Sequence, residues 1–259
     1  MPDLRPTVFL TLAAAFLASA CSHTAMRQEA ATSRWSGARQ LVLVTTTGWD
    51  ANQGSLRTFN WTANGWQPVG AAAPVTIGRA GSAWGVGLHD AQPGPVKREG
   101  DGRAPAGVFS LGPAFGYAAT TSTALRYLPM TASHYCVDVS GSPMYNQIVD
   151  ARKVGMAAVA GSTEPMRLDI HGHGDQRYKN GLVIGHNPKG VPGAGSCIFV
   201  HLWKAPGETT AGCTAMAEPV MDRLQAWLRP EQHPVFVLLP ESEVARLQMA
   251  WQLPERINP

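Results

Sequence analysis

The stretch GSCIFVHLWKAPGETTAGCTAMAEPVMDRL, residues 195–224, combines an apolar run, a loop and a helical pattern. The run before His201 is β-branched and aromatic, which is typical of a buried strand. Cys213 follows a Thr-Ala-Gly turn and directly precedes a helix expected over residues 217–228, where apolar residues recur on one face and Pro230 ends the pattern. We therefore expect a strand–loop–helix unit that carries a histidine at one joint and a cysteine at the other.

Strand patterns with short connections fill most of the remaining chain. The run QLVLVTTT at residues 40–47 is β-branched and uninterrupted, and Asn64-Gly65 is a hairpin-turn signal. The pattern predicts one domain, mainly β with a few packed helices (α+β). The strands are expected at residues 40–47, 55–61, 65–69, 75–79, 81–88, 107–111, 135–139, 166–170, 182–185, 196–203 and 235–239, and a short helix is expected at 242–252.

Composition excludes several classes of protein. Charged residues make up 15% of the 259, below the roughly 25% of typical soluble domains, and the chain contains 27 Gly and 20 Pro. This balance disfavours a helical bundle. A hydrophobic content of 44% and a net charge of only +3 exclude intrinsic disorder. No Lys/Arg-rich run occurs, so nucleic acid is not an expected partner.

The N-terminus has the pattern of an export signal. In MPDLRPTVFLTLAAAFLASAC, residues 1–21, one basic residue precedes an apolar run that is too short to span a bilayer. Cys21 follows small residues, as in the bacterial lipoprotein box, although Ala18 stands where Leu is usual. An ordinary secretory signal is the alternative. We expect a signal at 1–21, a polar tether at 22–39, the main domain at 40–240, and a C-terminal helix and tail at 241–259.

Assigning Cys21 to a lipid leaves three cysteines in the folded part. Three is an odd number in a compartment where disulfides form, so at least one thiol stays free. Cys136 and Cys197 could form a bridge that leaves Cys213 free, both could be buried and unlinked, or Cys197 could pair reversibly with Cys213. Sequence does not give the Cα separations that decide among these arrangements.

Cys213 and His201 are candidates for thiol catalysis. A thiolate attacks carbonyls, so the cysteine pKa must fall from about 8.5, and both a helix N-terminus and a histidine base can lower it. We expect Gly212 to allow a sharp turn, so that backbone N–H groups around Cys213 face a developing oxyanion. The alternative is a buried, inert cysteine.

These residues resemble the catalytic domain of the L,D-transpeptidase (YkuD-type) family, in which a GSxIFxH strand precedes a [ST]xGC loop. GSCIFVH (195–201) and TAGC (210–213) match the two ends of that signature. Three upstream blocks are also similar: KREGDGRAPAGVFSLGPAFGY (97–117), SPMYNQIV (142–149) and GLVIGHN (181–187). The resemblance covers roughly residues 41–239 and implies a β-sandwich or barrel-like catalytic domain.

The resemblance implies a cysteine acyl-transferase that modifies peptidoglycan without a cofactor. Cys213 would take a stem peptide as a thioester, and His201 would act as general base and later as acid for the leaving amine. The N–H groups of Gly212 and Cys213 would line the oxyanion hole, and Thr210 would steady the loop. Carbapenems would be the acylating class of β-lactam.

Two positions depart from the family pattern. Ala211 stands where many members have His, and Cys197 stands where Ala is frequent. Both departures leave the proton path open. The acyl acceptor is open as well: a second stem peptide gives a cross-link, an amino acid gives exchange, and water gives carboxypeptidase action.

A zinc peptidase is the rival enzyme. His171-Gly-His173-Gly-Asp175 has a spacing used by zinc hydrolases, but Gln176 stands where a further His would complete the stronger pattern. His89, His186 and His201 could add ligands. The alternative to a zinc site is that His171 and His173 lie on a partly exposed loop near the cleft. We expect no metal.

A cell-wall-binding lipoprotein without turnover is the non-enzymatic alternative. The expected partners are peptidoglycan stem peptides and, through the lipid at Cys21, a membrane. We expect a monomer in the periplasm. The charged residues of the 97–103 loop are expected to be solvated, as surface charges usually are.

Overall fold

The computed structural model describes residues 35–255, and β-strands dominate them. The strands are β1 Gln40–Thr46, β2 Gln53–Thr62, β3 Gly65–Thr76, β4 Ser82–Trp84, β5 Ala104–Gly116, β6 Tyr127–Pro129, β7 His134–Cys136, β8 Ile148–Asp150, β9 Glu164–Pro165, β10 Asn180–Ile184, β11 Phe199–Leu202, β12 Thr214–Met216 and β13 Val235–Pro240. The helices are α1 Ala151–Val154, α2 Leu168–His171, α3 Glu218–Trp227 and α4 Glu241–Leu247, and 3₁₀ turns occur at Met156–Val159 and Pro230–Gln232. The expectation of a mainly β domain with few helices is confirmed.

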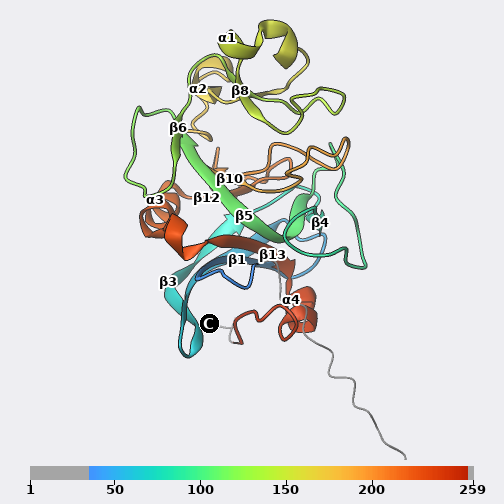
Figure 1. Ribbon diagram of the computed structural model, residues 1–259, viewed down its shortest axis with the longest axis vertical. Helices are drawn as coiled ribbons and strands as arrows, with labels where there is room; N and C mark the ends of the chain where they lie inside the picture. Colours follow the sequence, from blue (N-terminus) through green and yellow to red (C-terminus); the bar gives the residue numbers. More distant parts are fainter. Residues whose placement is uncertain (1–34, 256–259) are drawn as a thin grey trace, which may run out of the picture. The chain divides into compact units, whose positions relative to one another are not determined.

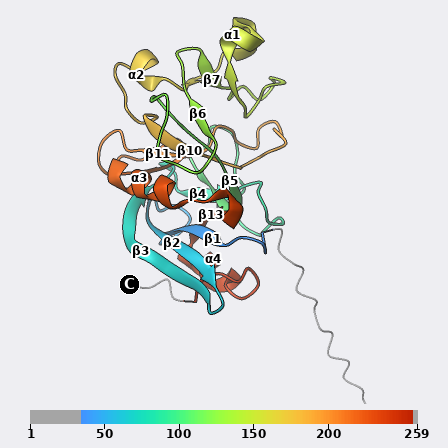
Figure 2. The ribbon, with the colours of Figure 1, turned by 60° about the vertical axis from the view of Figure 1, so that its left-hand side comes forward.

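The main sheet closes on itself. Its strand order is β10-β11-β12-β3-β2-β1-β13-β5-β4, and β10 also pairs with β5. This second pairing joins the first strand of the path to β5, which lies next to its other end, so the core is barrel-like (Figure 1). The long β2–β3 hairpin runs along one side, and α3 packs on β10 and β11 (Figure 2). Closure removes the unpaired edges that an open sheet would expose.

A smaller sheet lies at one end of the barrel. It has the order β8-β7-β9 and carries α1 and α2, at the top of Figure 1, whereas α4 packs at the opposite end. The small sheet begins where β6 leaves the barrel and ends before β10 returns to it. This insertion between two barrel strands places its residues beside β11.

The main core is continuous and reaches beyond the expected domain bounds. It contains Trp35 and Ala38, which were expected in the tether, and Val244, Leu247 and Leu253 from the C-terminal part. Residues 35–39 therefore belong to the domain rather than to a tether, and α4 belongs to the domain because its apolar face packs on the core. The signal at 1–21, Cys21 and the rest of the tether lie outside the described residues. Between residues 35 and 255, no helix is long and apolar enough to cross a membrane.

Three expectations about local structure are wrong. Residues 166–170 were expected to form a strand, but Leu168–His171 is a helical turn that buries Leu168 and exposes Ile170. Four residues are too few for an apolar period to distinguish the two structures. Residues 65–69 and 75–79 are not separate strands, because β3 runs through Gly65–Thr76 with a register shift opposite β2. The C-terminal helix ends at Leu247 rather than at residue 252.

Candidate active site

Cys213 and His201 come together because β11 and β12 are adjacent parallel strands. Val200 pairs with Thr214 and His201 with Ala215, so Cys213 lies beside Phe199, and the Phe199 N–H donates to its Sγ at 3.3 Å. Residues two apart in a strand share a face, so His201 lies on the same face as Phe199. His201 and Cys213 therefore occupy diagonal positions on one face of two adjacent strands.

Hydrogen bonding fixes the tautomer of His201. Its Nδ1 lies 2.7 Å from the Leu202 carbonyl oxygen, which can only accept, so Nδ1 carries the proton. Nε2 is then the nitrogen that can receive a proton. The side chain is 3% exposed, and burial lowers the pKa of His201 to about 4. At neutral pH His201 is an uncharged base with a defined accepting nitrogen.

Cys213 is a buried thiol in the resting protein. It is 8% exposed, and its Sγ–H donates to the Cys197 carbonyl oxygen at 3.5 Å. Burial, and then the negative charge of Glu164, raise the pKa of Cys213 to about 12. The expectation of a lowered pKa is wrong for this state. Its supposed cause is also missing, since β12 separates the cysteine from α3, which begins at Glu218.

The loop before Cys213 is held by the Thr210 hydroxyl. This group accepts from the Gly212 N–H at 3.1 Å and donates to the Cys213 carbonyl oxygen at 2.7 Å. One of the two expected oxyanion donors, the Gly212 N–H, is thus engaged within the loop. Ala211 is exposed.

Gly212 is required by a close approach rather than by a sharp turn. It is not among the residues with positive φ. A Cβ at this position would lie 2.9 Å from the Arg103 carbonyl oxygen. The expected reason for this glycine is therefore wrong: it lets the Cys213 loop pack against the chain at Arg103.

A disulfide joins Cys136 to Cys197, with 5.9 Å between their Cα atoms. Of the three arrangements left open by the sequence, the structure has the bridge. Cys213 is the free cysteine among residues 35–255. The bridge ties β7 of the small sheet to the segment that enters β11, whose Cys197 carbonyl contacts the thiol.

The matched sequence blocks meet in a hydrogen-bond network beside the site. Asn146 accepts from the Cys197 N–H at 2.8 Å and donates to the carbonyls of His186 and Asn187, both at 2.9 Å. Asn187 in turn donates to the Gly195 carbonyl at 3.0 Å. The network fixes the backbone that leads into β11.

The charged loop at residues 97–103 is not a solvated turn, contrary to expectation. Lys97 is 5% exposed and pairs with Asp101 at 2.5 Å. Glu99 accepts from Ser196 at 2.6 Å and from the Tyr145 hydroxyl, which connects the loop to the network beside the site. Only Arg98 in this group of charges is exposed. Ion pairs and hydrogen bonds within the protein therefore satisfy most of the charges of this loop in place of water.

Two residues next to the site were missed by sequence reasoning. The Tyr178 ring packs edge-on against His201 at 5.3 Å and against Phe199 at 5.5 Å, and its hydroxyl donates to Glu164. Burial raises the pKa of Glu164 to about 7. Neither residue has a motif signal, because the contact depends on the insertion folding back over β11.

The histidines of the rival zinc site do not gather. His171 ends α2 and contacts the Ala132 carbonyl at 2.8 Å, and both His171 and His173 are exposed. His186 bonds the Val86 N–H and the Ala194 carbonyl. Across residues 35–255, no group of three or more His, Cys, Asp or Glu side chains could hold a metal ion.

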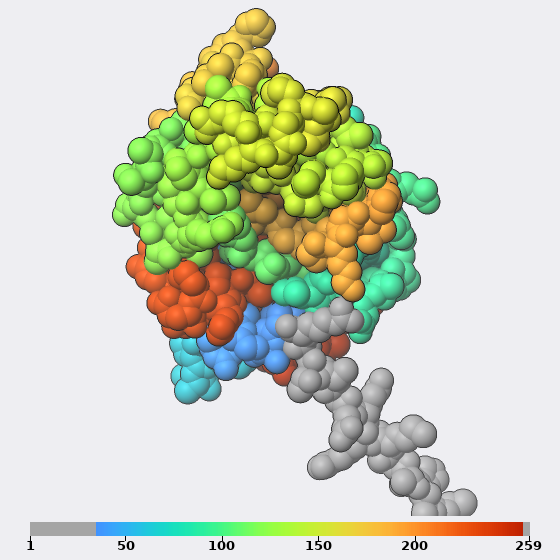
Figure 3. All heavy atoms as spheres, turned by 45° about the horizontal axis from the view of Figure 1, so that its top comes forward, coloured from blue at the N-terminus to red at the C-terminus, as the bar shows by residue number. Residues whose placement is uncertain are grey.

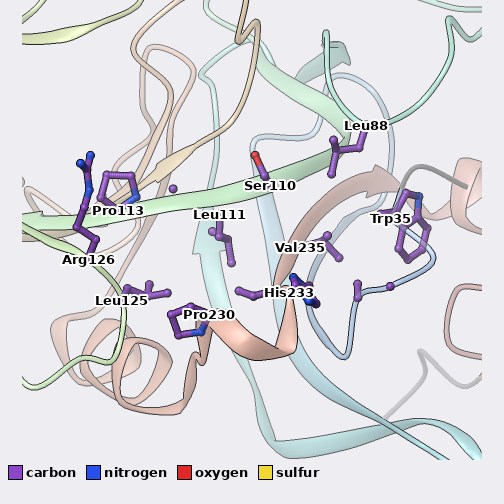
Figure 4. Close-up of a pocket in the computed structure, with 14 residues that line it drawn as sticks. Trp35, Leu88, Ser110, Leu111, Pro113, Leu125, Arg126, Pro230, His233 and Val235 are labelled. Carbon is purple, nitrogen blue, oxygen red and sulfur yellow. The ribbon is translucent and has the colours of Figure 1, made fainter.

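The surface has a recess at the end near the small sheet and a separate cavity elsewhere in the domain. At the end of the barrel that bears the small sheet, a recess exposes orange atoms, the colour of the region around β10 and β11 (Figure 3). A separate cavity of about 570 Å³ lies between β5, β13 and the chain near Trp35, and its lining includes Leu111, Arg126 and His233 (Figure 4). That cavity contains neither Cys213 nor His201.

Comparison with known proteins gives no relative. No family model, no curated protein and no solved structure matches the chain. Functional inference therefore rests on the site and on the sequence motifs.

Proposed function

We propose that the protein is an L,D-transpeptidase, a cysteine acyl-transferase that modifies peptidoglycan stem peptides on a YkuD-type domain. The observation that carries this proposal is the Cys213–His201 arrangement: a free thiol and a neutral imidazole on one face of β11 and β12, with Nδ1 of the histidine engaged by a carbonyl. Support comes from the motif blocks, since each of the three upstream blocks contacts the segment that leads to this pair: Glu99 accepts from Ser196, Asn146 accepts from the Cys197 N–H, and Gly181 pairs with His201.

The chemistry begins from neutral groups. His201 Nε2 takes the Sγ proton of Cys213 as the sulfur attacks the carbonyl between an L-centre and a D-residue. The C–S bond forms, and the Cys213 N–H is the expected donor to the oxyanion, since the Gly212 N–H is engaged by Thr210. The C–N bond then breaks as the imidazolium returns the proton to the leaving amine, which leaves a thioester. An amine or water attacks the thioester and regenerates the thiol.

Cys213 and His201 are both neutral in the free protein, so the thiol becomes a nucleophile only when substrate is bound. Burial makes the thiolate costly in the free protein, so proton transfer is coupled to attack rather than completed beforehand. We further propose that the protein acts in the periplasm, anchored through lipid at Cys21. The acceptor may be read from the products: a cross-linked dimer, an exchanged terminal residue or a shortened stem.

The test is turnover of defined muropeptides, with products identified by mass. The wild-type protein is expected to convert a stem peptide, and Cys213→Ala to show no conversion. Thiol alkylation should inactivate the enzyme and EDTA should not, whereas a zinc peptidase would show the reverse. Activity retained in Cys213→Ala, or the absence of any conversion by the wild type, would contradict the proposal.

A further inference from the structure

A groove at the α4 end of the barrel is lined by tryptophans and by amide side chains. Its volume of about 770 Å³ lies within the roughly 300–1,000 Å³ of typical ligand pockets, and its lining includes neither Cys213 nor His201. One wall is the tip of the β2–β3 hairpin, and the other is the turn that follows α4. The tryptophans and amides that line it are Trp61, Asn64, Trp66, Gln67, Gln248 and Gln252.

The two walls of this groove are fixed to each other and to the barrel. Trp66 packs against the main core, and its Nε1 donates to the Gln252 carbonyl oxygen across the groove at 2.8 Å. Leu253, in the second wall, is 3% exposed in the same core, and its N–H donates to the Gln248 carbonyl at 2.9 Å. The groove is therefore formed in the free protein, so a ligand would have little to order on binding.

Trp61 offers an accessible aromatic ring in this groove. It is 37% exposed, and two neighbours hold it in place: Trp66 packs edge-on at 5.1 Å, and the Arg39 guanidinium lies 5.9 Å from the ring centroid. The face of an aromatic ring is negatively polarised, so it attracts groups whose hydrogens are positively polarised. The C–H bonds on the face of a sugar ring are such groups.

The polar groups of the groove are almost all uncharged. Asparagine and glutamine side chains each offer both a donor and an acceptor, and within residues 35–255 the amides of Asn64 and Gln252 make no hydrogen bond. Glu255 is the one ionisable residue among the described residues of the lining, and no Lys or Arg is among them. Nucleic acids and anionic lipids, which are bound through cationic side chains, do not fit this lining.

We propose that this groove binds an uncharged oligosaccharide chain, with one sugar ring stacked on Trp61 and its hydroxyl groups bonded by the amides. A sugar ring has C–H bonds on its faces and hydroxyl groups at its rim, which matches an aromatic surface bordered by donors and acceptors. The groove lies at the end of the domain opposite to the small sheet (Figure 1). Sugar binding there is a separate function that does not depend on the proposed transpeptidase activity.

The first experiment measures sugar binding to the whole protein by isothermal titration calorimetry. The probes are the β-linked tetramer of N-acetylglucosamine and cellotetraose, which distinguish a chain with acetamido groups from one with hydroxyl groups alone. At least one of them should bind, with the same Kd at low and at high salt, because no charge pair contributes. Binding of neither sugar, or a Kd that weakens with salt, would overturn the inference.

The second experiment locates the binding with variants. Trp61→Ala should weaken the Kd at least about tenfold, since an aromatic anchor carries a large share of binding energy, and Trp61→Phe should restore most of the loss because it keeps a ring. Gln67→Ala, at an exposed position on the hairpin, should weaken the Kd by a smaller factor. The matched control is Gln53→Ala, an exposed glutamine at the other end of β2, which should bind as the wild type does.

Urea unfolding of Trp61→Ala shows whether the domain remains folded. Wild-type affinity in Trp61→Ala would place the sugar elsewhere and overturn the assignment of the groove. Equal losses in Gln67→Ala and Gln53→Ala would do the same, because only the first of these residues lines the groove.

A second copy of the chain is the rival occupant, because an exposed tryptophan also suits a protein contact. Sedimentation velocity over a range of protein concentrations separates the two. The wild-type protein should sediment as a monomer, with and without the N-acetylglucosamine tetramer. A dimer that Trp61→Ala abolishes would assign the groove to a protein interface and overturn the inference.

Discussion

His201 couples the candidate site to the stability of the fold. Its imidazole is held neutral by burial, with Nδ1 donating to the Leu202 carbonyl. A charged imidazolium at this place would lie in the interior beside the Tyr178 ring, where burial outweighs the charge of Asp175. The property that makes the histidine a usable base therefore makes the fold sensitive to acid.

The contribution of His201 to stability should fall as the pH is lowered from about 6.5 toward 4, whereas Glu164, whose pKa is raised to about 7, contributes in the opposite direction. The pKa of His201 is about 4 in the fold against an ordinary value of 6.5, so in this window the unfolded chain binds the extra proton. The stabilisation is complete above 6.5 and is lost as the pH falls through the folded pKa, on the order of 3 kcal/mol for this residue. His186, whose pKa burial also lowers to about 4, should add to the effect.

Urea unfolding at pH 7 and at pH 4.5 measures this loss. The His201→Gln variant should lose less free energy of unfolding between the two pH values than the wild type, because a buried imidazole with a lowered pKa is gone. The same loss in both proteins would show that His201 titrates normally.

Gly212 provides a test of the loop geometry at the residue scale. In Gly212→Ala the new Cβ would meet the Arg103 carbonyl oxygen at 2.9 Å, so the Cys213 loop must shift. We expect turnover to fall at least about tenfold, with a loss of stability of about 1–2 kcal/mol. The control is Gly48→Ala, where nothing lies within 4 Å and φ is not positive. Equal activity in the two variants would contradict the packing argument.

At the scale of elements, the disulfide holds the small sheet to the strand that carries the site. Cys136 belongs to β7 and Cys197 precedes β11, with a sequence separation of 61. A loop of this length contributes about 4 kcal/mol in the chain-entropy model. Without the bridge, the contacts of Glu164 and Tyr178 with the site would depend on packing alone.

Replacing both bridged cysteines by serine should lower the free energy of unfolding by about 2–4 kcal/mol and reduce turnover. Thiol counting provides the direct check. In unreduced, denatured Cys21→Ser protein we expect one free thiol, that of Cys213. A count of three would exclude the bridge, and peptide mapping that joins Cys197 to Cys213 would contradict the pairing.

Sequence patterns predicted helices and strands best where the patterned segment was long. The buried run of β1, the hairpin turn at Asn64-Gly65 and the one-sided helix α3 all lie close to their expected bounds. Short elements failed, as at α2, because a few apolar residues fit either structure. Motifs predicted the nearness of Cys213 and His201 and left a buried cysteine as the alternative, but they did not predict that β12 lies between the thiol and the helix.

At the scale of the whole molecule, long-range contacts account for what the sequence could not predict. Glu164 reaches the site only because the β8-β7-β9 insertion folds over β11, and Asn146 only because its block meets the segment after β10. Closure of the barrel depends on the second pairing of β10 with β5, which no local period encodes. Such contacts between distant residues are set by the completed fold.

The proposed export and anchoring depend on residues that lie outside the described ones. The apolar run that ends at Cys21 predicts lipidation, and bacterial lipoproteins carry several acyl chains because one chain binds membranes only weakly. Cys21→Ser should therefore move the protein from the membrane fraction to the soluble fraction or leave an unprocessed precursor, as judged by fractionation and intact mass. Unchanged membrane partitioning and processing would contradict the lipid anchor.

The most direct test of the central claim is the site at which an acyl group is trapped. The protein is incubated with a carbapenem, and its intact mass and modified peptide are determined, with Cys213→Ala and His201→Gln in parallel. The account predicts one adduct on Cys213 in the wild type, none in Cys213→Ala and slower formation in His201→Gln. An adduct on a serine, or the same adduct in Cys213→Ala, would contradict the assignment of Cys213 as the nucleophile.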